Sequence, residues 1–248
     1  MAMEIRVGCC GFPQAREKYF AHLRLVEVQQ TFYQPPQPAT AERWRAEAPP
    51  GFVYCLKAWQ LITHPATSPT YRRLREPLPP EAHGRVGFFR PTPEVWAAWE
   101  RTREMARLLE AAVVVFQCPA SFLPTPEHVE DLRRFFERVD RGAFRFAWEP
   151  RGPWPEDLIR GLCRDLDLIH CVDPFQGLPV TFGVAYFRLH GIGGYGYRYT
   201  LQDLRRLLAW CQGYEQAYVL FNNASMWEDA LAFADLLGQG GLEGGPVV

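Results

Sequence analysis

Short apolar runs rich in β-branched and aromatic residues recur along the chain, and stretches of helical periodicity separate most of them. Bounded apolar runs of this kind are typical of buried strands, whereas apolar positions three and four residues apart predict amphipathic helices. The strands that we expect span Ile5–Cys10, Leu25–Gln30, Val53–Ala58, Val113–Cys118, Phe144–Glu149, Leu168–Val172, Ala185–His190 and Ala217–Asn222. The helices that we expect span Ala39–Ala48, Pro93–Glu110, Pro126–Asp140, Trp154–Cys163, Thr200–Gln212 and Ser225–Leu237. Eight strands alternating with helices predict an α/β fold, a (β/α)8 TIM-barrel-like single domain over residues 1–248.

Two connections depart from this regular alternation. The connection after the third strand runs from Trp59 to Pro91 without a long helical pattern. Loops of this length are uncommon in compact domains and are often functional, so we expect either a mobile lid or an insertion packed over the barrel rim. The segment after the sixth strand, "DPFQGLPVTFG", is too short and proline-rich for a full helix, which predicts a degenerate unit there.

Composition narrows the class of protein but does not select a ligand. The formal net charge of −1 gives no global attraction to nucleic acid or to a membrane surface. Neither a signal-peptide pattern nor an apolar run near the length needed to span a bilayer occurs in the sequence. The seven cysteines show no C-x-x-C spacing, and several lie in apolar runs, as expected of a reduced, cytoplasmic protein. Few lysines and asparagines beside 22 prolines give a thermophile-like composition.

Polar residues stand where nearly every predicted strand ends, and these ends are where barrels of this class place their chemistry. The residues are Glu27, Gln29, Lys57, Gln117, Glu149, Arg151, Asp173, Arg188, His190, Asn222 and Asn223. Strand alternation places Glu27 with Gln29 on one face, and it places Tyr186 with Arg188 and His190 on one face. A desolvated charge costs several kcal/mol unless it is paired, so this set forms either a structural ion network or a ligand site, and we favour the ligand site.

Three residues of this set stand out by their rarity. Lys57 is one of only two lysines, which indicates a need for a compact, titratable ammonium group at a strand end. Asn222 and Asn223 are the only asparagines, and they stand side by side. A turn needs at most one asparagine, so we expect at least one of the two amides to face the ligand.

A glycine-rich loop, "HGIGGYGYRYT", follows the seventh strand. Gly191, Gly193 and Gly196 match G-x-G-x-x-G, but the next strand ends in asparagine where a dinucleotide site carries an acid, so no nicotinamide or flavin is expected. Phosphate binding recurs after the seventh and eighth strands of such barrels, which makes Gly191, Gly193 and Gly194 a weak phosphate-site prediction.

Metal chemistry draws on the same polar residues but has a weaker signal. A divalent metal could use Glu27, Glu149, Asp173 and His190, but no H-x-x-x-H or H-E-x-x-H spacing supports it. We therefore assign no metal ligands.

Successive motifs resemble one known family along almost the whole chain. They are "VGCCGF", "VEVQQTFYQPP", "FVYCLKAWQLITH", "VVVFQCPASF", "AWEPRGPW", "YFRLHG" and "YVLFNN". In these the chain resembles the YecE-like family, also called domain of unknown function 72, which implies a TIM-barrel-like fold and no established activity. The resemblance also places family-motif positions at Glu27, Thr31, Phe32, Tyr33, Lys57, His64, Gln117, Glu149, Arg151, Arg188, His190, Gly191, Asn222 and Asn223. Two departures are Phe12, where the family usually has tryptophan, and Gly152, where a histidine is often found.

Three functional hypotheses follow, and the first is favoured. The chain is an enzyme, of hydrolase or isomerase/lyase type, acting by acid–base chemistry on a small polar, sugar-like or phosphorylated molecule. Glu27 or Glu149 would be the general base, while Lys57, Arg188 and His190 would stabilise anionic charge or donate protons. One alternative is a nucleic-acid-binding or nucleic-acid-processing barrel, with or without a metal ion. The other is a non-catalytic barrel that binds a ligand or a protein partner. The sequence leaves the oligomeric state open.

Overall fold

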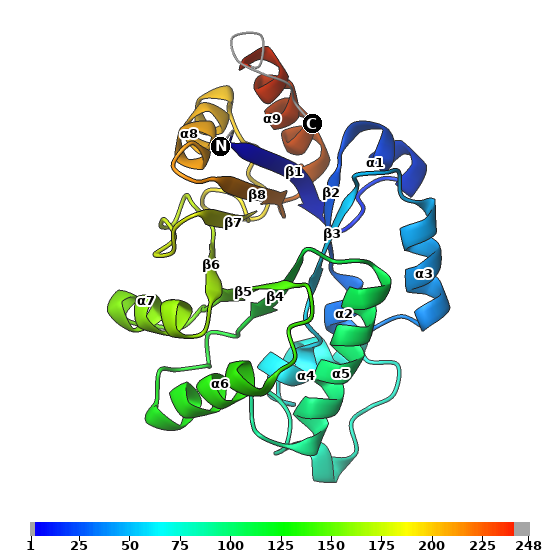
Figure 1. The fold of residues 1–248 in the computed structure, drawn as a ribbon, viewed down its shortest axis with the longest axis vertical. Coiled ribbons are helices and arrows are strands. Elements are labelled where there is room, and N and C mark those ends of the chain that lie inside the picture. The colour runs from blue at the N-terminus through cyan, green and yellow to red at the C-terminus, as the bar shows by residue number, and fades with distance from the viewer. Residues whose placement is uncertain (1–2, 241–248) are drawn as a thin grey trace. The chain divides into compact units, whose positions relative to one another are not determined.

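Parallel strands and helices alternate along the chain in a computed structural model, which describes residues 3–240 (Figure 1). The strands are β1 (Glu4–Cys10), β2 (Leu25–Val28), β3 (Val53–Lys57), β4 (Val113–Gln117), β5 (Arg145–Glu149), β6 (Leu168–Val172), β7 (Val184–Leu189) and β8 (Gln216–Phe221). They are ordered β1 to β8 and close into a barrel. The predicted (β/α)8 class is therefore confirmed, with each strand near its predicted range.

The longer helices follow the predicted helical segments closely. They are α3 (Pro38–Glu47), α5 (Pro93–Leu108), α6 (Pro126–Arg138), α7 (Glu156–Asp165), α8 (Leu201–Cys211) and α9 (Met226–Gly240). Side-chain caps fix several starts: the Thr125 hydroxyl accepts from the His128 amide, and Thr200 forms a reciprocal capping box with Asp203. No helix within residues 3–240 has the length and apolar content that crossing a bilayer requires.

Short helices that the sequence pattern did not predict fill the connections. They are α1 (Arg16–His22), α2 (Gln30–Tyr33) and α4 (Gln60–Thr63), with 3-10 turns η1 (Pro69–Arg73) and η2 (Pro80–Ala82). The last three lie in the long connection after β3, where the Gly87 and Phe89 amides donate back to the carbonyls of Leu61 and Ile62. That connection is thus folded onto its own first turn. Residues 173–183, between β6 and β7, contain no helix, as predicted.

The contacts group the chain into two compact units, and each is described by itself. Unit 1 comprises Met1–Glu27, Pro49–Phe52 and Cys171–Val248, and unit 2 comprises Val28–Ala48 and Val53–His170. The expectation of one domain over residues 1–248 stays a prediction.

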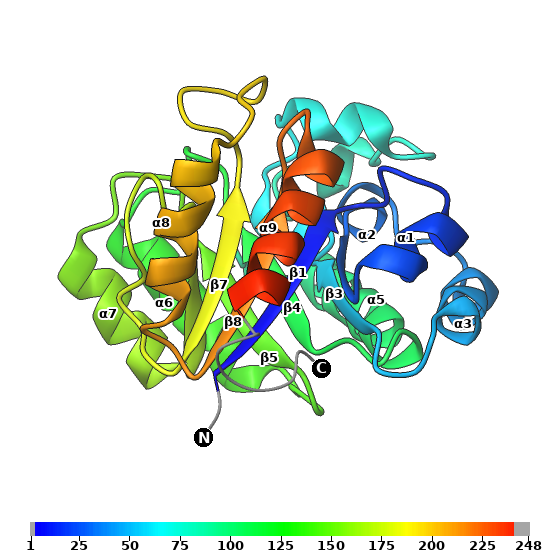
Figure 2. The same cartoon turned by 90° about the horizontal axis from the view of Figure 1, so that it is seen from above.

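In unit 1, the central strand pairs are β1 with β8 and β7 with β8. Their registers are regular, with Val7 opposite Val219 and Arg188 opposite Leu220. Helix α9 lies along β1 and β8 (Figure 2). This packing buries Phe233 completely. The parallel pairing of β7 with β8 brings their carboxyl ends to one edge.

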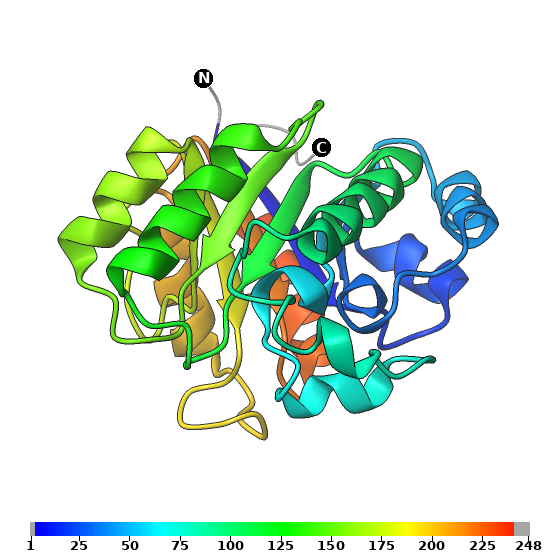
Figure 3. The ribbon, with the colours of Figure 1, turned by 90° about the horizontal axis from the view of Figure 1, so that it is seen from below.

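In unit 2, strands β3, β4 and β5 pair in register, and α5 and α6 lie beside β4 and β5 (Figure 3). Aromatic side chains fill the space between the strands and these helices. Phe116 and Phe146 from the strands contact Phe135 and Phe136 from α6, with ring centroids 4.9–5.8 Å apart. This aromatic layer packs against β4 and β5, the strands that end in Gln117 and Glu149.

Candidate functional site

The predicted site residues fall in both compact units. Unit 1 contains Glu27, Asp173, Tyr186, Arg188, His190, Gly191, Gly193, Gly194, Asn222 and Asn223. Unit 2 contains Gln29, Tyr33, Lys57, His64, Gln117, Glu149 and Arg151.

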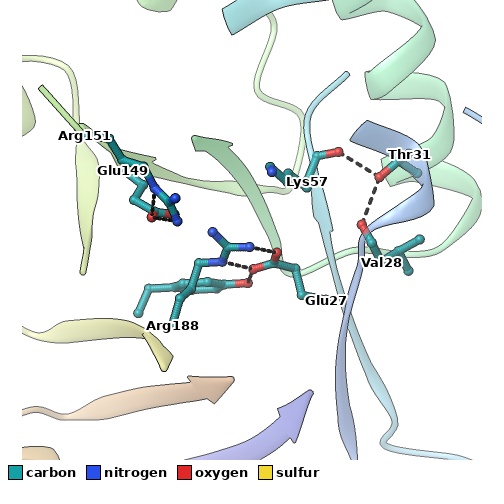
Figure 4. A network of polar contacts seen from close by, with 8 residues as sticks. Glu27, Val28, Thr31, Lys57, Glu149, Arg151 and Arg188 are labelled. Atoms are coloured by element: carbon teal, nitrogen blue, oxygen red, sulfur yellow. Dashed lines mark hydrogen bonds and ion pairs between the residues drawn. The ribbon is translucent and has the colours of Figure 1, made fainter. Parts of the chain in front are cut away.

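Glu27, Tyr186 and Arg188 form a closed polar group in unit 1, which we call the Glu27 cluster (Figure 4). Arg188 donates to both carboxylate oxygens of Glu27, from Nη2 at 3.0 Å and from Nε at 3.1 Å. The Tyr186 hydroxyl donates to the same carboxylate at 2.9 Å. The shared contact confirms that Tyr186 and Arg188 lie on one face of β7. Glu27 is 0% exposed and Arg188 is 1% exposed, so this bidentate pair lies in the dry interior.

Asp173 and His190 form a second contact in unit 1. The His190 amide donates to Asp173 Oδ2 at 2.9 Å, and the imidazole Nδ1 lies 3.6 Å from the same oxygen. Asp173 also caps the next turn by accepting from the Phe175 amide. About a quarter of the His190 side chain is exposed, whereas Asp173 is buried. Asp173 therefore holds the His190 backbone by a hydrogen bond, and its carboxylate lies beside the ring.

The two adjacent asparagines differ in burial and in hydrogen bonding. The Asn223 amide nitrogen donates to the Tyr197 carbonyl and to Asp229 Oδ2, each at 2.7 Å, and the residue is fully buried. It therefore joins the loop after β7 to helix α9. Asn222 is half-buried, and its backbone amide continues the ladder to the Leu189 carbonyl. Of the two amides, that of Asn222 remains the candidate for ligand contact.

The glycine-rich loop after β7 uses much of its own hydrogen-bonding capacity. The Gly191 amide donates to the Tyr199 hydroxyl at 2.9 Å, and the Gly194 amide donates to the Gly191 carbonyl at 3.3 Å. Among the described residues the Gly193 amide has no hydrogen-bonding partner. A phosphate at this loop would therefore find one uncommitted donor among the three glycines that the sequence prediction names.

In unit 2, three polar residues end neighbouring strands. Lys57 ends β3 opposite Val115 of β4, and Gln117 ends β4 opposite Glu149 of β5. Their carboxyl-terminal positions on parallel strands place them at the same edge of the sheet. Lys57 and Glu149 are each 5% exposed, and Gln117 is half-buried.

The Lys57 ammonium group lies 3.5 Å from the centre of the Phe32 ring. Its backbone carbonyl accepts a hydrogen bond from the Thr31 hydroxyl at 2.7 Å, and that hydroxyl also lies 3.0 Å from the Val28 carbonyl (Figure 4). Helix α2 thus holds the end of β3 from the side. The family-motif positions Thr31 and Phe32 therefore act on Lys57 itself.

His64 follows α4, and its ring is held in a neutral state. The residue is 5% exposed, its ring meets Phe32 edge-on at 4.9 Å, and its Nδ1 lies 2.8 Å from the Thr63 hydroxyl. Burial, followed by the charges of Lys57 and Arg151, lowers the pKa of His64 from 6.5 to about 3. The Glu149 carboxylate acts in the opposite direction. His64 is therefore an uncharged imidazole at neutral pH.

Glu149 and Arg151 complete this group. Arg151 donates from both Nε and Nη2 to Glu149 Oε1 at 2.7 Å, while its side chain remains 39% exposed. We call Lys57, His64, Glu149 and Arg151 the Glu149 cluster. A side chain at the neighbouring Gly152 would place its Cβ 2.9 Å from the Phe122 carbonyl oxygen, so the close backbone leaves no room there for a histidine.

Beyond the end of β2, Gln29 directly precedes α2 and Tyr33 ends it. Strand β2 ends at Val28, and Gln29 has helical backbone angles, so the expected face-sharing of Gln29 with Glu27 was wrong. The alternation of side chains stops where the strand stops. Tyr33 is covered by the Arg73 guanidinium at 3.5 Å from its ring centre, and its carbonyl accepts from Gln60 Nε2.

Sequence reasoning missed Thr63 and Tyr71, which hold His64. The Tyr71 hydroxyl donates to the His64 carbonyl at 2.8 Å. Both residues lie in the long connection after β3, where no periodic pattern marks them. Within residues 3–240, no group of three or more histidine, cysteine, aspartate or glutamate side chains is placed to hold a metal ion.

Comparison with known proteins identifies the family. The model of the family described as "Protein of unknown function DUF72" matches residues 12–244, and the chain belongs to this family. The sequence resemblance is thereby confirmed. A search of curated proteins found no match.

Solved structures confirm the barrel fold. A DUF72 family protein from Enterococcus faecalis V583 superimposes with a TM-score of 0.70 at 20% identity, over 96% of this chain and 98% of that chain. Endonuclease IV from Thermus thermophilus gives a TM-score of 0.56 at 14% identity, over 98% of this chain and 100% of that chain. D-Psicose 3-epimerase from Clostridium cellulolyticum H10 gives 0.54 at 10% identity, over 97% of each chain. At these identities the similarity establishes the fold alone.

Proposed function

We propose that this DUF72 chain is an enzyme that performs acid–base chemistry on a small polar ligand, sugar-like or phosphorylated, at the Glu149 cluster. The observation that carries the proposal is a neutral, buried imidazole beside a buried carboxylate and two cationic groups in one unit. Environments that push titratable groups away from their ordinary pKa values are typical of acid–base sites.

Each member of the cluster has a role in this proposal. Glu149 removes a proton from the ligand, because a carboxylate is the natural base beside a histidine that stays neutral. The His64 imidazole hydrogen-bonds the ligand oxygen on which negative charge develops. Lys57 and Arg151 stabilise that charge, and they bind a phosphate or carboxylate group if the ligand carries one.

The Glu27 cluster supports the choice of Glu149 as base. Both oxygens of Glu27 accept hydrogen bonds from Arg188, and the carboxylate is fully buried. A base must reach the proton that it abstracts within hydrogen-bonding distance. Glu27 and Arg188 therefore serve the proposal as structural support, while Glu149 carries the chemistry.

Deuterium incorporation tests this function directly. The protein is incubated in D2O with a panel of aldoses, ketoses and their 6-phosphates, and loss of carbon-bound protons is followed by NMR. We expect exchange in at least one panel member and a loss of about 100-fold or more in Glu149→Gln, the scale of a general base. Glu137→Gln, an exposed carboxylate on α6, is the matched control and keeps the wild-type rate. A Glu149→Gln protein that exchanges as fast as wild type would contradict the proposal.

A further inference from the structure

The Thr63 hydroxyl and the His64 ring form an isolated pair in the interior of unit 2. Thr63 Oγ1 lies 2.8 Å from His64 Nδ1, and the two residues are 1% and 5% exposed. Within residues 3–240 neither the hydroxyl nor the ring has a second hydrogen-bonding partner. One proton must therefore lie between these two atoms. Whether it is bonded to Thr63 Oγ1 or to His64 Nδ1 decides the tautomer of His64.

Accounting for the hydroxyl hydrogen separates the two arrangements. If Nδ1 carried the proton and donated it, the hydrogen of the Thr63 hydroxyl would be left in the interior without an acceptor. An orphaned buried donor is a costly polar defect. If Nδ1 is bare, Thr63 donates to it, and the only hydrogen left to place is that of the ring. Within residues 3–240, His64 Nε2 is not among the fully buried side-chain nitrogen and oxygen atoms that lack a partner, so a hydrogen there can reach solvent or a ligand. The neutral ring then carries its hydrogen on Nε2.

The surroundings hold the ring in this orientation. The His64 amide donates to the Gln60 carbonyl at 2.8 Å, and the Tyr71 hydroxyl donates to the His64 carbonyl. On the other side Gly87 packs so closely that a Cβ there would lie 2.3 Å from the His64 carbonyl oxygen. The ring itself contacts Phe32 edge-on. A ring flip would break the Thr63 bond without offering a replacement in the described part of the chain.

We propose that Thr63 is a positioning residue that fixes His64 as the Nε2–H tautomer, so that His64 donates a hydrogen bond to the ligand and does not accept its proton. This inference rests on the proposed function and sharpens it. A bare Nδ1 occupied by Thr63 cannot act as a base toward a ligand, which leaves proton abstraction to Glu149. The ligand class that fits is one whose oxygen gains negative charge as a neighbouring proton leaves, such as a carbonyl compound passing through an enolate.

Nitrogen NMR of the histidine rings tests the tautomer without any ligand. Protein labelled with 15N is recorded at pH 7, and the His64 signals are assigned by their loss in His64→Asn. We expect a pyridine-type Nδ1 and a pyrrole-type Nε2 in the wild type. A pyrrole-type Nδ1 in the wild type would overturn the inference, and this measurement requires no Thr63 variant to fold.

Two substitutions then test the role of the hydroxyl. Thr63→Val keeps the shape but removes the donor, so the Nδ1 resonance moves toward that of a nitrogen without a hydrogen bond. Thr63→Ser keeps the donor and the wild-type resonance. An unchanged Nδ1 resonance in Thr63→Val would overturn the inference.

Deuterium exchange on the active panel member separates this inference from the proposed function. We expect Thr63→Val to lower kcat about tenfold at unchanged KM, and Thr63→Ser to restore it. If the tautomer is as expected but Glu149→Gln exchanges normally, the proposed function fails while the tautomer assignment stands. If Glu149→Gln is inactive but Nδ1 is pyrrole-type, the function stands and the role of Thr63 fails.

Discussion

Two buried glutamates, each bound by an arginine, lie in very different surroundings. Glu27 in unit 1 is 0% exposed, and its Arg188 partner is 1% exposed. Glu149 in unit 2 is 5% exposed, but its Arg151 side chain is 39% exposed. The first pair is sealed on both sides, whereas the second has a solvent-exposed partner.

The two carboxylates also differ in how their arginine partners bind them. Both Glu27 oxygens accept from one rigid guanidinium, which is the geometry of a structural brace. Arg151, whose side chain is partly exposed, donates to Glu149 Oε1, and Glu149 lies close enough to His64 to influence its pKa. The buried Glu27 carboxylate thus has a buried partner in unit 1, whereas the Glu149 carboxylate, the base in the function that we propose, has a partly exposed partner in unit 2.

Replacing each glutamate by glutamine tests whether the two pairs contribute differently to stability, and it has the largest expected effect. Glu27→Gln leaves the Arg188 charge buried without its counter-charge, and we expect a loss of about 3–5 kcal/mol in the free energy of unfolding. Glu149→Gln leaves an Arg151 side chain that is already partly exposed and can be solvated, so we expect a smaller loss than in Glu27→Gln. Guanidinium denaturation at pH 7 measures both values. Equal losses in the two variants would show that the clusters do not differ in kind.

The two asparagines of unit 1 allow the same test of buried against half-buried side chains with uncharged groups. Removing the Asn223 side chain leaves Asp229, itself 2% exposed, and the Tyr197 carbonyl without their amide donor. We expect Asn223→Ala to lose about 2–3 kcal/mol, since one of its bonds goes to a charged group. Asn222→Ala, at a half-buried position, is the matched control, with an expected loss below about 0.5 kcal/mol. The same denaturation experiment compares them, and a larger loss in Asn222→Ala would reverse the assignment of their tasks.

The sequence pattern predicted the barrel because each strand is a bounded apolar run and each long helix carries a full periodic face. Helices α2 and α4 each have four residues, too few for periodicity to show, and so Gln29 was wrongly assigned to a strand. Strand ends were correctly recognised as polar. Which of these ends are sealed could not be predicted, because the partners of Glu27 lie about 160 residues away in the chain.

The pH dependence of stability tests whether His64 in unit 2 is held neutral by the fold. The pKa of His64 is lowered from 6.5 to about 3, so the folded protein binds fewer protons than the unfolded chain between these values. Its contribution to stability is complete above pH 6.5 and is lost as the pH falls toward 3, by roughly 2 kcal/mol at pH 5. We expect His64→Asn to be less sensitive to pH than the wild type between pH 6.5 and 5.

Unfolding free energies at several pH values measure this difference. His170, whose pKa burial lowers to about 4, contributes to the pH dependence of both proteins and therefore cancels in the comparison. Identical pH slopes in wild type and His64→Asn would mean that the His64 imidazole is not held neutral by the fold.

The smallest expected effect concerns where an anion binds. Gly193 has a positive φ of 77°, and a Cβ there meets no atom within 4 Å, so Gly193→Ala costs only the backbone strain of about 1 kcal/mol. If the Glu149 cluster binds the anionic group of a ligand, inorganic phosphate raises the melting temperature of Gly193→Ala by as much as it raises that of the wild type. Arg151→Ala, which removes an exposed cationic group from that cluster, then loses most of this phosphate-dependent increase. The opposite pattern, with the increase lost in Gly193→Ala and kept in Arg151→Ala, would move the anion to the glycine loop of unit 1 and remove Arg151 from ligand binding.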